Sequence, residues 1–283
     1  MADVRDTRNA QLIYTHPVNI WDFAVQPDGP YIAIIAKHII DADVFLYDRT
    51  RPNEPARNLT QQQYGDVKKL DISKNGDIIF TNLVSNHAEK DLRNAQETGI
   101  FLIPHHELNK EKPSAKLLVP QKRTPSDLTW SPAADQIAYA VWPMEGFRIP
   151  GVGVYIFDIK TSRITQISRT GYDPAFSPDG KKFAFHTRDE IVITEPRARA
   201  PQHIVPLDMR AAGYLSWTPD GKHIVHGTFG LGPAITNIQD GSQRIIFDQF
   251  DRIVWIWLDW VHTEAYPVEP AGRMVIPWGS LKK

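Results

Sequence analysis

Five polar or charged residues occupy one recurring position of the sequence, seven residues before a repeated turn: Asp22, Lys69, Asp127, Asp173 and Tyr214. In a sixth repeat the spacing is irregular, and Asp251 or Asp259 comes nearest to that position. If the repeats surround an axis, these side chains meet at one end of it. Several carboxylates at short range suit a hard cation such as Ca²⁺. The set therefore predicts a polar ligand-binding site at this end, with a structural cation as a further expectation and no other cofactor.

A second interpretation of each aspartate stays open. An Asp just before a strand often caps a turn, because its carboxylate accepts hydrogen bonds from nearby backbone N–H groups. That structural role accounts for any single Asp of the set without a ligand. As a set, the residues still make the end of the axis the best place to expect a site.

Other catalytic chemistries find no positive support in the sequence. There is no cysteine, so no thiol nucleophile or thiolate metal site. The ten histidines are scattered without a His-Glu-x-x-His spacing, and we expect them at the surface or in turns. No Gly-x-Ser-x-Gly nucleophile motif is present. A hydrolase or lyase with a channel metal remains only an alternative.

The turn that sets the spacing is typical of a β-hairpin. In "DPAFSPDGKKFAF" (173–185), Pro178 fixes its own φ, Asp179-Gly180 tolerate left-handed angles, and an alternating apolar run follows. Equivalent positions, with one degenerate copy at an alanine, are Gly29, Gly76, Ala134, Gly180, Gly221 and Gly272. Their spacing of about 50 residues is typical of the four-stranded blades of a β-propeller.

The repeats predict an all-β fold, a single six-bladed β-propeller domain over residues 1–283 with four-stranded antiparallel blades. The predicted blades are 17–63, 64–121, 122–168, 169–207, 208–248 and 249–283, the last completed by 1–16. The sixth repeat supplies two strands before the chain ends, and residues 10–15 resemble an outer strand. An amino-terminal strand would thus close the last blade and remove exposed sheet edges.

Composition narrows the classes of partner. The formal net charge is −1, which gives no electrostatic reason to expect nucleic acid. No apolar run reaches 18 residues, so no membrane insertion is expected, and "MADVRDTRNA" is too charged for a signal peptide. With 42% hydrophobic and 23% charged residues, the chain is typical of a globular protein. We expect a monomer with a protein or peptide partner.

Three segments, "SPDGKKFAF", "TPDGKHIVHG" and "QPDGPYIAI", resemble the WD40-like PD40 repeats of the TolB-like β-propeller family. The resemblance covers nearly the whole chain and implies the fold, whereas proteins with this fold serve many functions. Within residues 1–283 we expect no counterpart of the separate amino-terminal α/β domain of TolB. The resemblance implies a periplasmic or extracellular protein if a leader is removed, and a cytoplasmic one otherwise.

A long connection favours one partner-contact element. "WPMEGFRIPGVG" (142–153) exceeds what a hairpin needs, and long loops on a rigid scaffold commonly bind partners. It carries Met144, Phe147 and Ile149. The sequence thus predicts a non-enzymatic scaffold that binds a protein or peptide at the loop-bearing end of the channel. The alternatives are a carbohydrate-active hydrolase or lyase, or a small-ligand or glycan-binding propeller.

Overall fold

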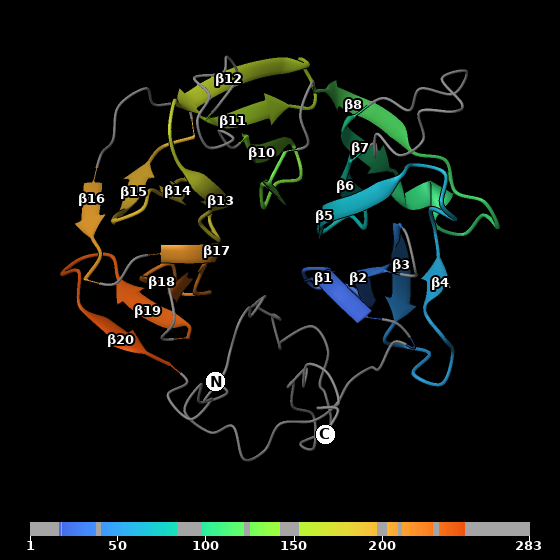
Figure 1. Cartoon of the computed structure of the whole chain (residues 1–283), viewed down its shortest axis with the longest axis horizontal. Coiled ribbons are helices and arrows are strands. Elements are labelled where there is room, and N and C mark those ends of the chain that lie inside the picture. Colours follow the sequence, from blue (N-terminus) through green and yellow to red (C-terminus); the bar gives the residue numbers. More distant parts are fainter. Residues whose placement is uncertain are drawn as a thin grey trace.

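The computed structural model describes residues 17, 19–37, 41–83, 98–121, 125–141, 153–196, 203–208, 211–228 and 232–246. These residues form five four-stranded antiparallel sheets, each a simple meander of consecutive strands. Figure 1 shows the sheets as blades set around a common centre. The predicted β-propeller class is confirmed. Five blades are described rather than six, and the residues of the predicted sixth blade, 249–283 with 1–16, lie outside the described part.

Each blade begins with its innermost strand. Blade 1 contains β1 (Asn19–Val25), β2 (Tyr31–Lys37), β3 (Ala42–Asp48) and β4 (Arg57–Asn58). Blade 2 contains β5 (Asp66–Ile72), β6 (Ile78–Leu83), β7 (Gly99–Ile103) and β8 (Lys116–Pro120), with a short 3-10 helix at His105–Glu107. Blade 3 contains β9 (Asp127–Trp130), β10 (Gln136–Val141), β11 (Gly153–Asp158) and β12 (Arg163–Ser168).

The last two described blades repeat this order. Blade 4 contains β13 (Tyr172–Phe176), β14 (Phe183–His186), β15 (Glu190–Thr194) and β16 (His203–Pro206). Blade 5 contains β17 (Ala211–Trp217), β18 (His223–Thr228), β19 (Ala234–Asn237) and β20 (Gln243–Ile245). The first strands β1, β5, β9, β13 and β17 contact one another in succession around the centre (Figure 1).

Apolar side chains fill the wedges between neighbouring blades. Between blades 1 and 2, for example, Ile35 and Val44 share one buried cluster with Phe80 and Phe101. The rings of Phe80 and Phe101 stack with their centroids 5.3 Å apart. Second strands are buried on both faces, which explains why β2 is the almost continuous apolar run YIAIIAK. This packing makes the ring of blades a firm support for the first strands.

The predicted turn is stabilised by its serine or threonine. In blade 4, the Ser177 hydroxyl accepts a hydrogen bond from the Lys182 amide at 2.8 Å and donates to Asp179 at 2.6 Å. Thr218 repeats both contacts in blade 5. Gly180 and Ala134 take the left-handed φ angles of 68° and 59°, so the degenerate third copy forms the same turn. Blades 2 to 5 share this left-handed position, at Gly76, Ala134, Gly180 and Gly221, whereas blade 1 has Gln26 in place of the hydroxyl residue and its left-handed residue is Asp28.

Candidate functional site

The five predicted site residues, Asp22, Lys69, Asp127, Asp173 and Tyr214, lie at the same level on the five inner strands. Together they form one layer, which we call the rung. Asp22 pairs across its blade with Ile35, Lys69 with Thr81, and Asp127 with Ala140, each three residues before the last paired position of its strand. A β-bulge precedes both Asp22 and Lys69, making Trp21 and Lys68 the extra residues. Bulges redirect side chains near functional sites. Because these residues are equally far from the repeated turn in sequence, they lie at the same height along the axis of the propeller.

Lys69 lies among the carboxylates of neighbouring blades. Its Nζ is 3.8 Å from Oδ1 of Asp127, and its side chain is 27% exposed. Burial alone would lower the pKa of Lys69, but the charges of Asp22, Asp127 and Asp173 outweigh it and raise that pKa. The structure therefore brings together four of the five predicted residues, contributed by four blades.

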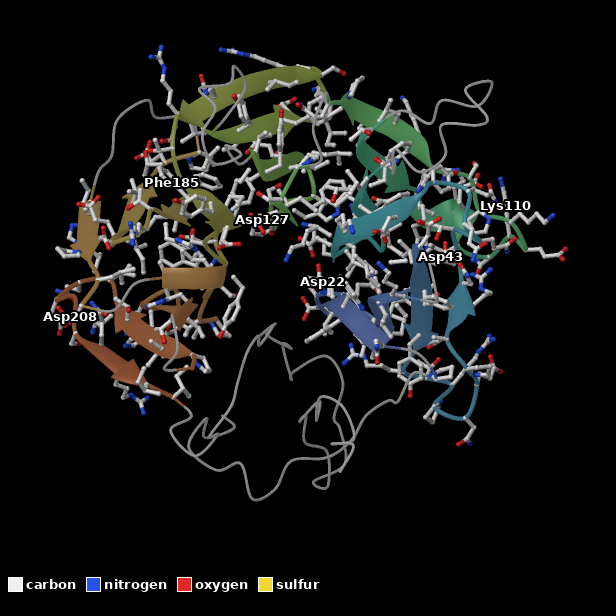
Figure 2. All side chains as sticks on the ribbon, viewed as in Figure 1. Asp22, Asp43, Lys110, Asp127, Phe185 and Asp208 are labelled. Atoms are coloured by element: carbon white, nitrogen blue, oxygen red, sulfur yellow. The ribbon has the colours of Figure 1, made fainter. Side chains whose placement is uncertain are left out.

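Asp22 connects the first two blades. Its Oδ1 accepts a hydrogen bond from the amide of Phe23 at 3.1 Å, and its Oδ2 accepts one from the amide of Leu70 on β5 at 3.4 Å. Burial raises the pKa of Asp22, opposed by the charge of Lys69 and by these two amides. Figure 2 shows Asp22 and Asp127 on the inner side of the ring. Asp22 thus combines the local backbone contact of a turn cap with a contact between blades.

Asp173 forms a buried pair with a residue that we expected at the surface. Its Oδ2 lies 2.6 Å from Nε2 of His186, which also lies 3.3 Å from the carbonyl oxygen of Gly213 in blade 5. Asp173 takes a φ of 47°, in the left-handed region. Burial would raise the pKa of Asp173 and lower that of His186. Their contact reverses both effects, leaving the pKa of Asp173 lowered and that of His186 raised.

Asp127 is the third carboxyl group of the cluster. Burial and the neighbouring charge of Asp173 raise its pKa to about 7, although Lys69 acts in the opposite sense. The two aspartates are hydrogen-bonded to each other, which requires a proton on one of them. Because His186 stabilises the anion of Asp173, the proton resides on Asp127. In this pair Asp127 is therefore protonated and Asp173 is ionised.

Tyr214 completes the rung from β17, between Gly213 and Leu215. Its hydroxyl is buried and has no hydrogen-bond partner among the described residues, and burial raises its pKa. Oδ2 of Asp127 is likewise buried and has no placed hydrogen-bond partner in the described part of the chain, while the Asp127 carboxyl group as a whole contacts Asp173 and Ser126. Two polar atoms on the rung are thus unsatisfied.

The predicted contact loop flanks this rung. β10 ends at Val141, β11 begins at Gly153, and these two residues pair beside the Ala140–Asp127 pair. The connections between second and third strands therefore leave the blades at the end where the rung lies, and the repeated turns lie at the other end. Met144, Phe147 and Ile149 lie outside the described residues, as do Asp251 and Asp259.

Trp21, an exposed tryptophan, lies next to Asp22. Counting seven residues back from the repeated turn did not identify it. Trp21 is 43% exposed. The Nζ of Lys37 lies 4.8 Å and that of Lys68 lies 5.9 Å from the centre of its ring. Both lysines also pair with Asp66. Trp21 thus places an aromatic surface, held by cation–π contacts from two blades, at the edge of the rung.

Two histidines correct the sequence interpretation. The expectation of surface or turn histidines is wrong for His186 and His226, whose side chains are buried. Nδ1 of His226 lies 3.0 Å from the Gly227 carbonyl and Nε2 lies 2.9 Å from Oγ1 of Thr236. The sequence did contain a signal for the Asp173–His186 pair. Phe176 pairs with Phe183 across the hairpin, and Asp173 and His186 each lie three residues from that pair, on opposite strands.

Two searches of the described residues bear on metals and membranes. No three or more His, Cys, Asp or Glu side chains there are arranged to hold a metal ion. The cation stays a prediction. Over the same residues, no helix has the length and apolar character needed to cross a bilayer.

Comparison with known proteins identifies the fold. No family model matches the chain. A structure of TolB from Acinetobacter baumannii superposes with a TM-score of 0.60 at 14% identity, covering 82% of this chain and 55% of that one. A putative TolB from Agrobacterium tumefaciens superposes with a TM-score of 0.61 at 16% identity, covering 85% and 84%.

One curated protein shares sequence with part of the chain. Dipeptidyl-peptidase 5 of Porphyromonas gingivalis is 28% identical over an alignment of 114 residues, which covers 35% of this chain and 17% of that protein. So short a match assigns no activity. The superposed structures, the repeated turn and the ring of four-stranded blades agree, and on these grounds the chain has a TolB-like β-propeller fold.

Proposed function

We propose that this propeller is a non-enzymatic interaction domain that binds a protein or peptide segment at the end of the channel where the inner strands begin. The observation that carries the proposal is the convergence of Asp22, Lys69, Asp127 and Asp173 from four blades onto one rung. Charged groups that converge from several blades at one end of a channel favour recognition of a polar partner.

Trp21 adds an apolar anchor to this polar surface. Interface residues that dominate binding energy are enriched in tryptophan, and a partly exposed ring beside fixed charges is typical of such an anchor. The ends of the 142–152 connection at Val141 and Gly153 lie beside the same rung. The contact role of Met144, Phe147 and Ile149 is part of the proposal. A peptide could therefore contact the rung, Trp21 and this connection together.

The main alternative is a hydrolase or lyase, and the Asp127–Asp173 pair is the observation that would favour it. Glycoside hydrolases hold their two carboxyl groups about 5 Å or more apart, so that a sugar or water fits between them. Asp127 and Asp173 are instead hydrogen-bonded to each other. This geometry favours binding over glycoside hydrolysis. The match to part of a protein named a dipeptidyl-peptidase supports a peptide as the ligand.

Selection from a displayed random-peptide library tests the proposal. Peptides that bind the wild-type chain are synthesised, and their affinities are measured calorimetrically for the wild type and for Trp21→Ala. Ile204→Ala serves as the control, because Ile204 is another exposed apolar side chain but lies on the outer strand β16. We expect Trp21→Ala to weaken binding by about tenfold and Ile204→Ala to leave it unchanged. Equal affinities for all three proteins would contradict the proposal.

A further inference from the structure

The charges of the central cluster do not cancel. When ionised, Asp22, Asp127 and Asp173 contribute three negative charges, and Lys69 and protonated His186 contribute two positive ones. Both oxygens of Asp22 accept backbone amides, and these contacts and the charge of Lys69 favour its anion, whereas burial raises its pKa. Both ring nitrogens of His186 face acceptors, Nδ1 the Thr187 carbonyl oxygen at 2.9 Å and Nε2 the Asp173 carboxylate at 2.6 Å, and this geometry favours the doubly protonated, cationic ring. One negative charge is left over, and in the free protein the proton on Asp127 neutralises it.

The leftover charge lies where a ligand can approach. The side chain of Asp127 is 13% exposed, whereas those of Asp173 and His186 are 7% and 2% exposed. Lys69 is the most open member of the cluster. The Asp127 carboxyl group contacts the Ser126 hydroxyl and Asp173, but its buried Oδ2 has no placed hydrogen-bond donor among the described residues, and neither has the Tyr214 hydroxyl on the same rung a placed partner there. An additional donor with a positive charge would satisfy this carboxylate.

We propose that the cluster binds a cationic group of a peptide, an ammonium or a guanidinium, in exchange for the proton that Asp127 shares with Asp173. The inference rests on the proposed function and names the chemistry of the ligand. In the exchange the Asp127 O–H bond breaks and the proton leaves to solvent. The carboxylate then accepts N–H donors from the ligand, and the charge of the cluster stays balanced before and after.

The proton exchange makes binding depend on pH in one direction. The described charged groups that act on Asp127 are Asp173 from β13, Lys69 from β5 and His186 from β14, and Asp22 from β1 acts on Lys69. The Ser126 hydroxyl also hydrogen-bonds to Asp127. Asp127 has a pKa of about 7, so below this pH a ligand must displace a bound proton. Affinity should fall by about tenfold for each pH unit below 7 and level off just above it.

Four short probe peptides test the proposal by NMR. The carboxyl carbon of Asp127 is followed through a pH titration of ¹³C-labelled full-length chain, alone and with each probe. The probes are acetyl-Gly-Lys-Gly-amide, acetyl-Gly-Arg-Gly-amide, Gly-Gly-Gly-amide with a free amino terminus, and neutral acetyl-Gly-Gln-Gly-amide. We expect at least one cationic probe to lower the titration midpoint of Asp127 by about one pH unit, and the neutral probe to leave it unchanged. The responding probe identifies the source of the cation.

Calorimetry in buffers of different ionisation enthalpy gives the second readout. The wild type should release a proton on binding the responding probe at pH 6.5. Asp127→Asn should release none and bind about tenfold more weakly, whereas Asp240→Asn, at the opposite end of the propeller, should match the wild type. No shift of Asp127 with any cationic probe would overturn the inference. Library peptides that need Trp21 but neither a cation nor proton release would sustain the proposed function while overturning this inference.

The reverse result separates the two proposals as well. A cationic probe that binds with proton release, in a chain that selects no library peptide, would sustain the exchange at Asp127 and contradict the peptide-binding function. Because the wild-type titration uses no variant, the inference remains testable if Asp127→Asn fails to fold.

Discussion

Nε2 of His186 lies 2.6 Å from Oδ2 of Asp173, and both side chains are buried beside the channel. The same nitrogen lies 3.3 Å from the carbonyl oxygen of Gly213, so the pair also connects blade 4 to blade 5. Because His186 keeps Asp173 ionised, the proton of the aspartate pair stays on Asp127. One contact thus contributes both to the stability of the ring and to the chemistry of the proposed site.

Breaking this pair should destabilise the fold. Asp173→Asn leaves His186 without its counter-ion, and loss of one partner of a buried ion pair costs about 3–5 kcal/mol. Chemical denaturation at pH 6 measures the loss as a fall in the free energy of unfolding. Asp189→Asn, in an exposed part of the turn after β14, should change it by less than about 0.5 kcal/mol. Equal stability of the two variants would show that the pair contributes nothing.

The contribution of this pair should also vary with pH. The folded pKa of His186 is raised, so its stabilisation is fully present below the unfolded pKa of about 6.5 and is lost as the pH rises through the folded value. The folded pKa of Asp173 is lowered, so its stabilisation is lost as the pH falls below about 3.9. The stability difference between wild type and Asp173→Asn should peak between about pH 4.5 and 6.5. A difference that grows steadily above pH 7 would contradict this assignment.

His226 should give the opposite dependence. Burial lowers its pKa to about 4, so folding favours the neutral ring. Its stabilisation is present above about pH 6.5 and is lost as the pH falls towards 4, by an amount on the order of 2–3 kcal/mol. The slope of unfolding free energy against pH over that interval should decrease in His226→Gln. The exposed His203→Gln should retain the wild-type slope, and a matching slope in both variants would refute the role of His226.

Replacing Ala134 by glycine should stabilise the third turn. Ala134 has a φ of 59°, where a side chain costs about 1–2 kcal/mol and glycine does not. After the greater freedom of glycine in the unfolded chain is subtracted, a gain of about 0.5–1 kcal/mol remains. Thermal unfolding measures it. Ala133→Gly, at the preceding exposed residue with an ordinary φ, should lower stability instead, and a loss of stability in Ala134→Gly would disprove the strain.

Local features of the sequence predicted the blades well. The Ser/Thr-Pro-Asp-Gly turn and the alternating runs act over a few residues, and the structure has the four-stranded antiparallel blades that they predict. Counting back from the turn also placed Asp22, Lys69 and Asp127 on one rung, because hairpin geometry keeps that distance constant.

Features that depend on contacts between strands were not predicted. The Asp173–His186 pair requires the register of β13 with β14, and the exposure of Trp21 requires the bulge before Asp22. The hydrogen bond between Asp127 and Asp173 joins two blades, so no spacing within one repeat reveals it. The sequence therefore predicted the position of the candidate site but not its protonation.

Backbone NMR of the complex tests the central claim most directly. The amides of Phe23 and Leu70 donate to Asp22 and report on the rung from two blades. On addition of a library-selected peptide, we predict that these two amides and that of Leu128, which follows Asp127 on β9, shift in proportion to the bound fraction. The amides of Ile164 on β12 and Ile204 on β16 should stay fixed. Shifts confined to these outer strands, with Phe23 and Leu70 unchanged, would contradict binding at the channel end.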